Sequence, residues 1–320
     1  MKISLITPAA EGSCAGNRTT AMRWAHIFRG LGHRVDVDTR YHGAPADLIV
    51  ALHAWRSAES IRAFRDHHPE RPLVVALTGT DIYRFLKTHP EATETSMALA
   101  DRLVGLHELV GNAIPAAVRG KLRIIYQSAT ALLHRLAPLR RSFEVLVIGH
   151  LREEKDPLRA ALAVRSMPTE SRLRILHLGQ AHDEHWADMA RQEMADNPRY
   201  RWRGEVPGRS VRRALARARL MVLSSTMEGG ANVISEALAA GTPIIASRID
   251  GSVGLLGGDY PGYFPVGDTA ALTALLWRAE SEPAFLEEIH RNCAPRAPLF
   301  DPARERNAWR DLLSELTGAG

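Results

Sequence analysis

Short apolar runs alternate along the chain with segments in which apolar residues recur every three or four positions. Runs of the first kind predict β-strands, and segments of the second kind predict α-helices. The expected strands of the first half are residues 2–7, 34–38, 47–52, 73–77, 100–106 and 122–126. A helix is expected from Thr19, and Gly30 and Gly32 end it before the strand at 34–38. Strands that alternate with helices favour an α/β protein with parallel sheets.

The alternation restarts at residue 143. The expected strands of the second half are residues 143–148, 173–178, 200–203, 220–223 and 243–246. The expected helices there are residues 209–217, 232–240 and 301–316. The segment 247–263 is rich in glycine and is expected to be a loop, and the polar stretch 135–141 contains a proline and is expected to be a linker. The pattern therefore predicts two α/β domains, 1–138 and 139–300.

Composition adds a preference for small anionic ligands. The chain has 320 residues, of which 45% are hydrophobic, enough for two packed cores. Its formal net charge is +5, and the positive charge comes almost wholly from arginine. The sequence has no basic tract and no stripe of interleaved aromatic residues, so no nucleic-acid partner is expected. A basic balance does suit anionic small substrates.

Cysteine and histidine spacings give no metal or redox motif. Cys14 and Cys293 are far apart, which fits a reduced cytosolic chain. His182 and His185 could share a helix face, but no third ligand accompanies them. The chain starts directly with an expected strand, and no apolar run approaches a membrane-spanning length. We therefore expect a cytoplasmic protein with no metal and no stable membrane insertion, and its oligomeric state is not predicted.

One βαβ unit, residues 220–246, carries the densest candidate chemistry. Glu228 lies in the loop before its helix, and Glu236 lies one turn inside the helix. Two glycines and an alanine follow Glu228 and leave room for a ligand to approach the backbone. Free N–H groups at the start of a helix favour an anion. The residues alone therefore predict an anionic group at the helix start, with one carboxylate on each side.

The same stretch, MEGGANVISEA followed by AGTPII, resembles the nucleotide-sugar signature of the retaining GT-B glycosyltransferases of family 4. That signature has two glutamates separated by seven residues and then a Gly-Thr-Pro type of turn. The resemblance implies that Glu236 binds the ribose of the donor and that Glu228 lies beside the donor sugar. It also implies that backbone amides cradle the donor diphosphate, namely those of Gly229, Gly230, Ala231, Asn232 and Val233.

The resemblance also implies cations in the segment GHLREEKDP, after the strand at 143–148. Relatives carry an arginine at the end of this strand and a lysine five residues later, and both neutralise the diphosphate. Lys155 matches the lysine, whereas His150 stands where the arginine is expected. Arg152 lies two positions further on and is expected to replace it. With these protein cations the family needs no divalent metal, so no cofactor is expected besides the donor substrate.

Residues of the first half are implied on the acceptor side. The loop after the first strand carries Gly16 near the donor phosphates and Asn17 and Arg18 near the acceptor. Arg18 lies at a helix start, where a contact with an anion and simple solvation explain it equally well. His53 follows the strand at 47–52 and is either a base or hydrogen-bond donor of the site or a buried structural histidine.

The strand at 73–77 runs into a polar turn that is also expected on the acceptor side. The turn consists of Thr78, Gly79, Thr80 and Asp81. Many relatives have a His-Gly-x-Asp pattern here, with the histidine near the donor sugar. Thr78 occupies the position of that histidine, so the role of the family histidine does not carry over.

The resemblance implies a GT-B fold, in which two Rossmann-like domains face a cleft and the last helix, 301–316, crosses back to the first domain. Five segments together look more narrowly like the bacterial selenosugar synthases of selenoneine biosynthesis: HAWRS, LTGTDIY, GHLREEKDP, MEGGANVISEA and SRIDGSVGLLGGDYPGYF. Those enzymes join selenophosphate to the sugar of UDP-N-acetylglucosamine or UDP-glucose and form a selenium–carbon bond. A UDP-sugar and selenophosphate are therefore the implied substrates.

Three other functions stay open. A family 4 transferase acting on a glycolipid, a polysaccharide or a small molecule would expose a basic and apolar helix face on the first domain. A nucleotide-sugar epimerase of GT-B fold would place more acid–base residues around the sugar. A non-catalytic nucleotide-sugar-binding protein would keep the donor site without turnover.

Overall fold

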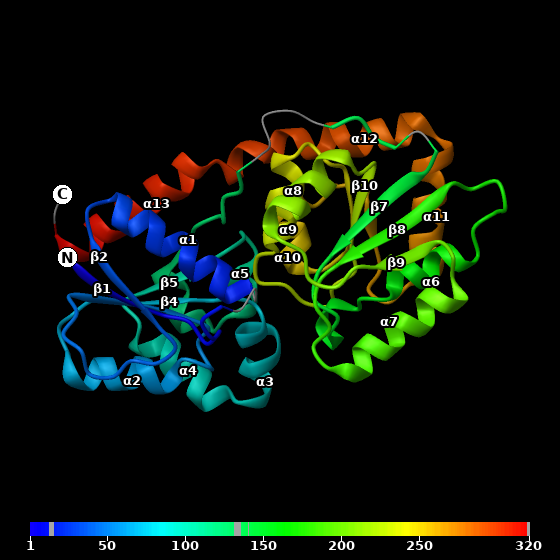
Figure 1. Cartoon of the computed structure of the whole chain (residues 1–320). Coiled ribbons are helices and arrows are strands. Elements are labelled where there is room, and N and C mark those ends of the chain that lie inside the picture. Colours follow the sequence, from blue (N-terminus) through cyan, green and yellow to red (C-terminus); the bar gives the residue numbers. More distant parts are fainter. Residues whose placement is uncertain (13–15, 131–135, 140, 319–320) are drawn as a thin grey trace. The chain divides into compact units, whose positions relative to one another are not determined.

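The computed structural model describes residues 1–12, 16–130, 136–139 and 141–318 (Figure 1). The chain divides into two compact units. The first unit comprises Met1–Gln127, Glu228–Gly230 and Pro302–Gly320, and the second comprises Ser128–Met227 and Ala231–Asp301. Each unit is built on a six-stranded sheet in which every neighbouring pair of strands is parallel.

The sheet of the first unit has the order β2-β1-β3-β4-β5-β6. Its strands are β1 (Lys2–Ile6), β2 (Arg34–Asp38), β3 (Leu48–Leu52), β4 (Leu73–Ala76), β5 (Arg102–Gly105) and β6 (Leu122–Ile124). The helical elements are α1 (Gly16–Gly30), α2 (Ala58–His67), the π-helical η1 (Asp81–Phe85), α3 (Leu86–Thr88), α4 (Pro90–Leu99), α5 (Val110–Ala113), the 3-10 turn η2 (Ala116–Lys121) and α13 (Pro302–Thr317). Strands β3 and β4 are buried at every position, which is typical of parallel strands covered on both faces.

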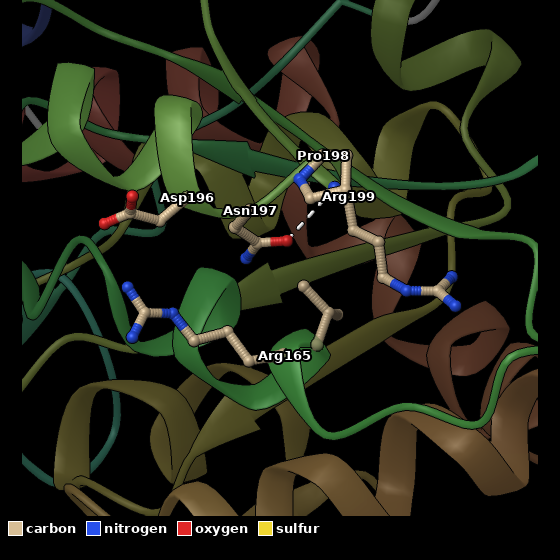
Figure 2. Close-up of a pocket in the computed structure, with 6 residues that line it drawn as sticks. Arg165, Asp196, Asn197, Pro198 and Arg199 are labelled. Carbon is tan, nitrogen blue, oxygen red and sulfur yellow. Dashed lines mark hydrogen bonds between the residues drawn. The ribbon is translucent and has the colours of Figure 1, made fainter.

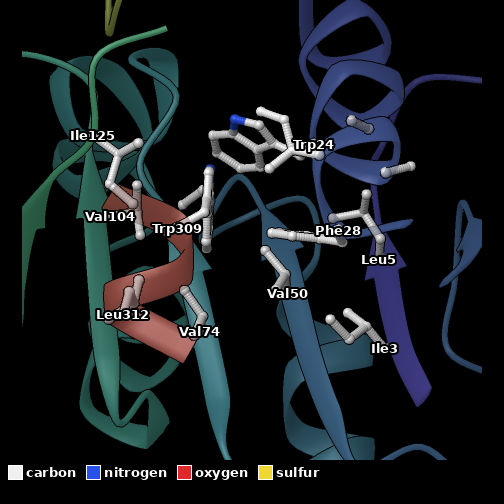
Figure 3. Packing of buried hydrophobic residues seen from close by; sticks show 14 of the residues in the cluster. Ile3, Leu5, Trp24, Phe28, Val50, Val74, Val104, Ile125, Trp309 and Leu312 are labelled. Carbon is white, nitrogen blue, oxygen red and sulfur yellow. The ribbon is translucent and has the colours of Figure 1, made fainter. Parts of the chain in front are cut away.

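The last helix, α13, packs into the core of the first unit. Its Trp309 meets Trp24 and Phe28 of α1 edge-on, with ring centroids 4.7 and 4.8 Å apart (Figure 3). The buried carboxylate of Glu305 on α13 accepts a hydrogen bond from Trp24 Nε1 at 2.8 Å. The prediction that the C-terminal helix joins the first domain is therefore confirmed.

The sheet of the second unit has the order β12-β11-β10-β7-β8-β9. Its strands are β7 (Phe143–Ile148), β8 (Leu173–Leu178), β9 (Tyr200–Trp202), β10 (Leu220–Leu223), β11 (Ile244–Ser247) and β12 (Tyr263–Phe264). The helical elements are η3 (Glu153–Lys155), α6 (Arg159–Arg165), α7 (Glu184–Asp196), α8 (Gly208–Arg217), α9 (Asn232–Ala239), α10 (Asp250–Leu256), α11 (Thr269–Ser281), α12 (Pro283–Cys293) and η4 (Ala294–Phe300). Strands β7, β8 and β10 have the predicted ends.

The segment 247–263 is not the loop that its glycines suggest, because it contains α10. The side chains of Leu255 and Leu256 are 2% and 4% exposed. Burial of two leucines stabilises by about 3 kcal/mol or more, which exceeds the penalty of about 1 kcal/mol for each helical glycine. The helix ends at Gly257, whose φ of +97° favours glycine.

The expected linker, 135–141, lies partly outside the described residues. Its residues 136–139 form neither helix nor strand, and the Leu136 N–H donates to the Ala216 carbonyl at 3.1 Å.

Candidate functional site

The second sheet reverses its order between β7 and β10. From β7 the chain continues to β8 on one side, whereas β10 pairs with β7 on the other side. Loops that leave neighbouring parallel strands in opposite directions open a crevice at the carboxyl ends, where open α/β sheets bind their ligands. Two loops leave the sheet at this point, residues 149–156 after β7 and residues 224–231 after β10. They carry seven residues of the predicted site: His150, Arg152, Lys155, Glu228, Gly229, Gly230 and Ala231.

Residues 149–156, named here the cation loop, are bound along both sides. On the β8 side the Leu151 N–H donates to the Gln180 carbonyl, and the Leu151 carbonyl accepts from the His182 N–H, both at 2.9 Å. On the β10 side the Thr226 N–H donates to the Glu154 carbonyl at 2.9 Å. The cation loop is therefore fixed to segments that follow both strands flanking β7.

The cation loop carries the two predicted cations, Lys155 and Arg152, together with His150. Lys155 is half-buried, and its Cδ lies 4.0 Å from the place that a Cβ on Gly149 would take. Arg152 lies 3.6 Å from the Glu154 carboxylate, and its buried Nε has no hydrogen-bond partner among the residues that the structure describes. His150 is half-buried in the same loop. An unsatisfied buried N–H is a donor that a bound anion would satisfy.

Asp156 closes the cation loop in a strained conformation. Its φ is +43° and its ψ is +57°, the left-handed region that non-glycine residues seldom adopt. Arg159 holds its carboxylate, with Nε 2.7 Å from Oδ2. Backbone strain of this kind persists only where the surroundings determine the conformation, and such residues cluster at functional sites.

The loop after β10 and the helix α9 that follows it carry the two predicted glutamates. Glu228 is half-buried in the loop, and Glu236 is half-buried on the helix. The N-cap residue of α9 is Ala231, which has no side chain able to cap the helix. Asn232 and Val233 therefore begin a helix whose N-terminal amides are not capped by the N-cap side chain, as an anion site requires.

The first sheet reverses its order between β1 and β3. Gly16, Asn17 and Arg18 form the start of α1 after β1; Gly16 is exposed, and the other two are half-buried. Cys14 lies outside the described residues. The loop after β3 begins with His53, so the structure places these candidates at the carboxyl edge where ligands are expected.

His53 is buried and joins two loops. Its Nδ1 accepts the Arg56 N–H at 3.1 Å, so the proton of the neutral ring lies on Nε2, which donates to Thr80 Oγ1 at 3.0 Å. Burial lowers the pKa of His53, and the nearby Asp81 carboxylate opposes that shift. The residue also has a φ of +75°. These contacts favour the structural one of its two predicted roles.

Asp81 shapes the turn that follows β4. Its fully buried carboxylate accepts the N–H groups of Thr78, Gly79, Ile82 and Ala54 at 2.7 to 3.2 Å. The oxygens of Asp81 are thus committed to the backbone. This geometry leaves the Thr78 and Thr80 hydroxyls as the candidates of this turn for contact with an acceptor.

Gly79 and Gly229 touch through their backbones within the first unit. A Cβ on Gly79, whose φ is +117°, would lie 2.4 Å from Gly229 N, and a Cβ on Gly229 would lie 2.3 Å from Gly79 N. Real side chains do not approach so closely, so both positions require glycine. The contact brings a predicted acceptor-side residue beside a predicted donor-side residue. Gly230 is similarly tight, since its Cβ would lie 2.4 Å from Leu106 Cβ.

An aromatic pair that was not predicted from the sequence lies beside His53. The rings of Trp55 and Phe85 stack at 3.8 Å with an interplanar angle of 13°. The Arg56 guanidinium lies 5.8 Å from the Phe85 centroid, and the His89 ring lies 4.7 Å from Trp55. Trp55 could have been noticed in the sequence, because it follows an apolar strand. Its partner Phe85 lies thirty positions later, and no local sequence pattern links the two residues.

A pocket lies at the opposite edge of the second sheet (Figure 2). Its lining comes from the ends of α6 and α7 and the connection between α7 and β9: Val164, Arg165, Asp196, Asn197, Pro198 and Arg199. Internal contacts engage its polar groups, since Asn197 Oδ1 accepts the Arg199 N–H at 3.0 Å and Arg165 pairs with Glu193. Because ligands bind at the carboxyl edge of such sheets, this pocket is not the candidate site.

Within the described ranges, no group of three or more His, Cys, Asp and Glu side chains is arranged to hold a metal ion. None of the helices in the described part of the chain is both long enough and apolar enough to cross a bilayer.

Residues 142–279 match the family of glycosyl transferases group 1. The matched region starts beside β7 and includes the cation loop, the loop after β10 and α9. A search of curated proteins gave no significant match.

Solved structures are similar over nearly the whole chain. HepE of Anabaena, solved with UDP and glucose, has a TM-score of 0.81 at 17% identity, with 98% of this chain and 100% of HepE covered. Sucrose-phosphate synthase of Thermosynechococcus elongatus has a TM-score of 0.79 at 17% identity and full coverage of both chains. A glycosyltransferase of Rickettsia africae has a TM-score of 0.74 at 12% identity, with 98% of each chain covered. At these identities the likeness establishes the fold, which is the predicted GT-B fold.

Proposed function

We propose that the protein is a glycosyltransferase that moves a sugar from a UDP-sugar to an anionic acceptor. The observation that carries the proposal lies in the second unit, where the cation loop and the segment before α9 both leave the sheet at its reversal point and are joined by the hydrogen bond from the Thr226 N–H to the Glu154 carbonyl at 2.9 Å. The match to glycosyl transferases group 1 spans both segments. HepE, which shares the fold, was solved with UDP-glucose and with UDP and glucose, which supports a uridine diphosphate donor.

In this proposal the donor lies along the start of α9. Glu236 accepts hydrogen bonds from the ribose hydroxyls, and Glu228 faces the sugar. Backbone amides around Gly230 and Asn232 and the positive end of the α9 dipole bind the diphosphate.

The cation loop stabilises the leaving group. Transfer breaks the bond between the anomeric carbon and the diphosphate oxygen, and the electron pair leaves with UDP. Lys155 and Arg152 neutralise the charge that develops on that oxygen, and this is a common way for protein cations to lower such a barrier. His150 contributes a further N–H donor to the same loop.

We further propose selenophosphate as the acceptor. The observation that favours it is the combination of five sequence segments quoted above. Selenium attacks the anomeric carbon as the bond to the UDP oxygen breaks, which forms the selenium–carbon bond. The phosphoryl group stays on selenium until water cleaves the Se–P bond and releases phosphate. A multiply charged anion suits the cationic site, with Arg18, Thr78 and Thr80 as its expected contacts. A glycolipid, polysaccharide or small-molecule acceptor is the alternative for the same donor site.

The test combines calorimetric measurement of UDP binding with a UDP-release assay on purified protein and a panel of UDP-sugars, with and without freshly generated selenophosphate. The proposal predicts UDP release from UDP-N-acetylglucosamine or UDP-glucose that selenophosphate accelerates. UDP binding without acceleration by selenophosphate would retain the donor site and reject this acceptor. No detectable UDP binding would reject the whole proposal.

A further inference from the structure

His177, on β8, is completely buried and bonds to the first carbonyl of the cation loop. Its Nε2 lies 3.1 Å from the Gly149 carbonyl oxygen, and its Nδ1 lies 2.9 Å from Tyr200 Oη. A carbonyl can only accept, so Nε2 carries the proton and Nδ1 accepts the Tyr200 O–H. Tyr200 thereby fixes the tautomer that holds Gly149. Burial lowers the pKa of His177 to about 4, so the ring is neutral at physiological pH.

The turn that His177 holds has no spare room. A Cβ on Gly179, which follows β8, would lie only 1.9 Å from the Gly149 oxygen. Trp202 Nε1 donates to the Gly179 carbonyl at 2.7 Å and fixes that residue from the other side. Lys155 Cδ lies 4.0 Å from the place that a Cβ on Gly149 would take. His177 thus fixes the start of the cation loop at a residue close to the Lys155 side chain.

Ser224 holds the other end of the cation loop. It is 3% exposed, directly after β10, and its Oγ lies 2.8 Å from the Asp156 carbonyl and 3.1 Å from the Lys155 carbonyl. Both acceptors are carbonyls, so the single O–H of Ser224 is shared between them, with the shorter contact to Asp156. These contacts hold the strained Asp156 and the backbone of Lys155 itself.

We propose that His177 and Ser224 are positioning residues that clamp the cation loop by its carbonyls and so aim Lys155 and Arg152 at the diphosphate of a nucleoside diphosphate. This inference rests on the proposed function. The clamp acts on the diphosphate and leaves the nucleoside, which Glu236 is proposed to bind, untouched. Removing the clamp should therefore weaken the binding of UDP more than the binding of uridine, whereas a general loss of structure would weaken both.

The experiment compares UDP and uridine binding by calorimetry in the full chain. Ser224→Ala and His177→Leu are expected to weaken UDP binding about fivefold to twentyfold and uridine binding less than about twofold, as the loss of one hydrogen bond to a loop implies. The conservative variants Ser224→Thr and His177→Gln keep a donor and are expected to restore most of the affinity. Glu236→Ala, the matched contrast, should weaken both ligands.

Each outcome decides the inference. Equal weakening of UDP and uridine in Ser224→Ala, or UDP affinity unchanged from the wild type, overturns it. If His177→Leu does not fold, Ser224→Ala and Ser224→Thr alone still decide it. If the wild-type protein binds neither UDP nor uridine, the proposed function is wrong. This result differs from those that overturn only the clamp by His177 and Ser224.

Discussion

His53 Nε2 donates to Thr80 Oγ1 at 3.0 Å, and this bond joins the loop after β3 to the turn after β4. The same turn is folded around the Asp81 carboxylate, which also accepts the Ala54 N–H at 3.1 Å. Two buried polar side chains thus hold together the loops that carry the acceptor-side candidates. His53 and Asp81 thus shape this part of the site. The Thr78 hydroxyl and the O–H of Thr80, whose oxygen already accepts from His53, are the groups proposed to contact a ligand.

Asp81→Asn is expected to destabilise the protein by about 2–4 kcal/mol, because an amide replaces one acceptor oxygen with a donor facing buried N–H groups. Urea denaturation followed by circular dichroism measures the change in the free energy of unfolding. Asp66→Asn, at an exposed position of α2, is the matched control and should change it by less than about 0.5 kcal/mol. A loss for Asp81→Asn no larger than that of the control contradicts the role.

Glu236→Gln and Glu228→Gln are expected to act on different steps. The first removes a charged acceptor for the ribose hydroxyls and should weaken UDP binding about tenfold, the size of one charge-assisted hydrogen bond. The second should lower kcat about a hundredfold or more with UDP affinity nearly unchanged, because its carboxylate faces the sugar. Calorimetry with UDP and steady-state UDP release separate the two effects.

The control for the glutamate variants is Glu170→Gln, an exposed residue outside both loops. This variant should change neither the affinity for UDP nor kcat. If Glu228→Gln weakens UDP binding as much as Glu236→Gln does and leaves kcat intact, the assigned roles are wrong.

Lys155→Ala is expected to lower kcat about a hundredfold, since a cation that meets the leaving diphosphate supplies on the order of 3 kcal/mol in the transition state. Lys87→Ala, at an exposed lysine of α3, is the matched control. Rates come from UDP release at saturating donor. If Lys155→Ala releases UDP as fast as the Lys87→Ala control, Lys155 does not stabilise the leaving group.

Two buried histidines predict a loss of stability in mild acid. Burial lowers the pKa of His107 and of His177 to about 4 from 6.5. The unfolded chain therefore binds more protons than the native chain between these values, so stability is fully present above pH 6.5 and falls as the pH drops towards 4. Each histidine accounts for about 3 kcal/mol over that window.

His107→Gln should make the free energy of unfolding depend less on pH between 6.5 and 4.5, measured by urea denaturation at several pH values. His26→Gln, at an exposed position of α1, is the control and should leave the slope unchanged. Parallel wild-type and His107→Gln profiles would show that His107 does not titrate as proposed.

Much of the fold could be predicted because its signals are local. Strands β7, β8 and β10 are short apolar runs bounded by turn residues, and their ends were predicted to the residue. The helix α10 was missed because two of its seven residues are glycines, and the burial of Leu255 and Leu256 that stabilises it is a tertiary effect.

The site was predictable only where one segment carries it. Glu228 and Glu236 lie in one βαβ unit, so their spacing was visible in the sequence. The contacts of His177 with Gly149 and of Ser224 with Asp156 join residues 28 and 68 positions apart, so no local sequence pattern predicts them. The commitment of Asp81 to backbone amides likewise depends on a loop that folds back on its carboxylate.

The most direct test of the central claim is mass spectrometry of the products formed from UDP-N-acetylglucosamine and selenophosphate by the wild type and by Glu228→Gln. A control without selenium accompanies each reaction. The wild-type reaction is expected to give an ion at the mass of the selenium-linked sugar, with the selenium isotope pattern, and a stoichiometric amount of UDP. The Glu228→Gln variant is expected to give much less of both products. UDP-sugar that is recovered intact with selenophosphate and with every other acceptor tried would contradict sugar transfer by this protein.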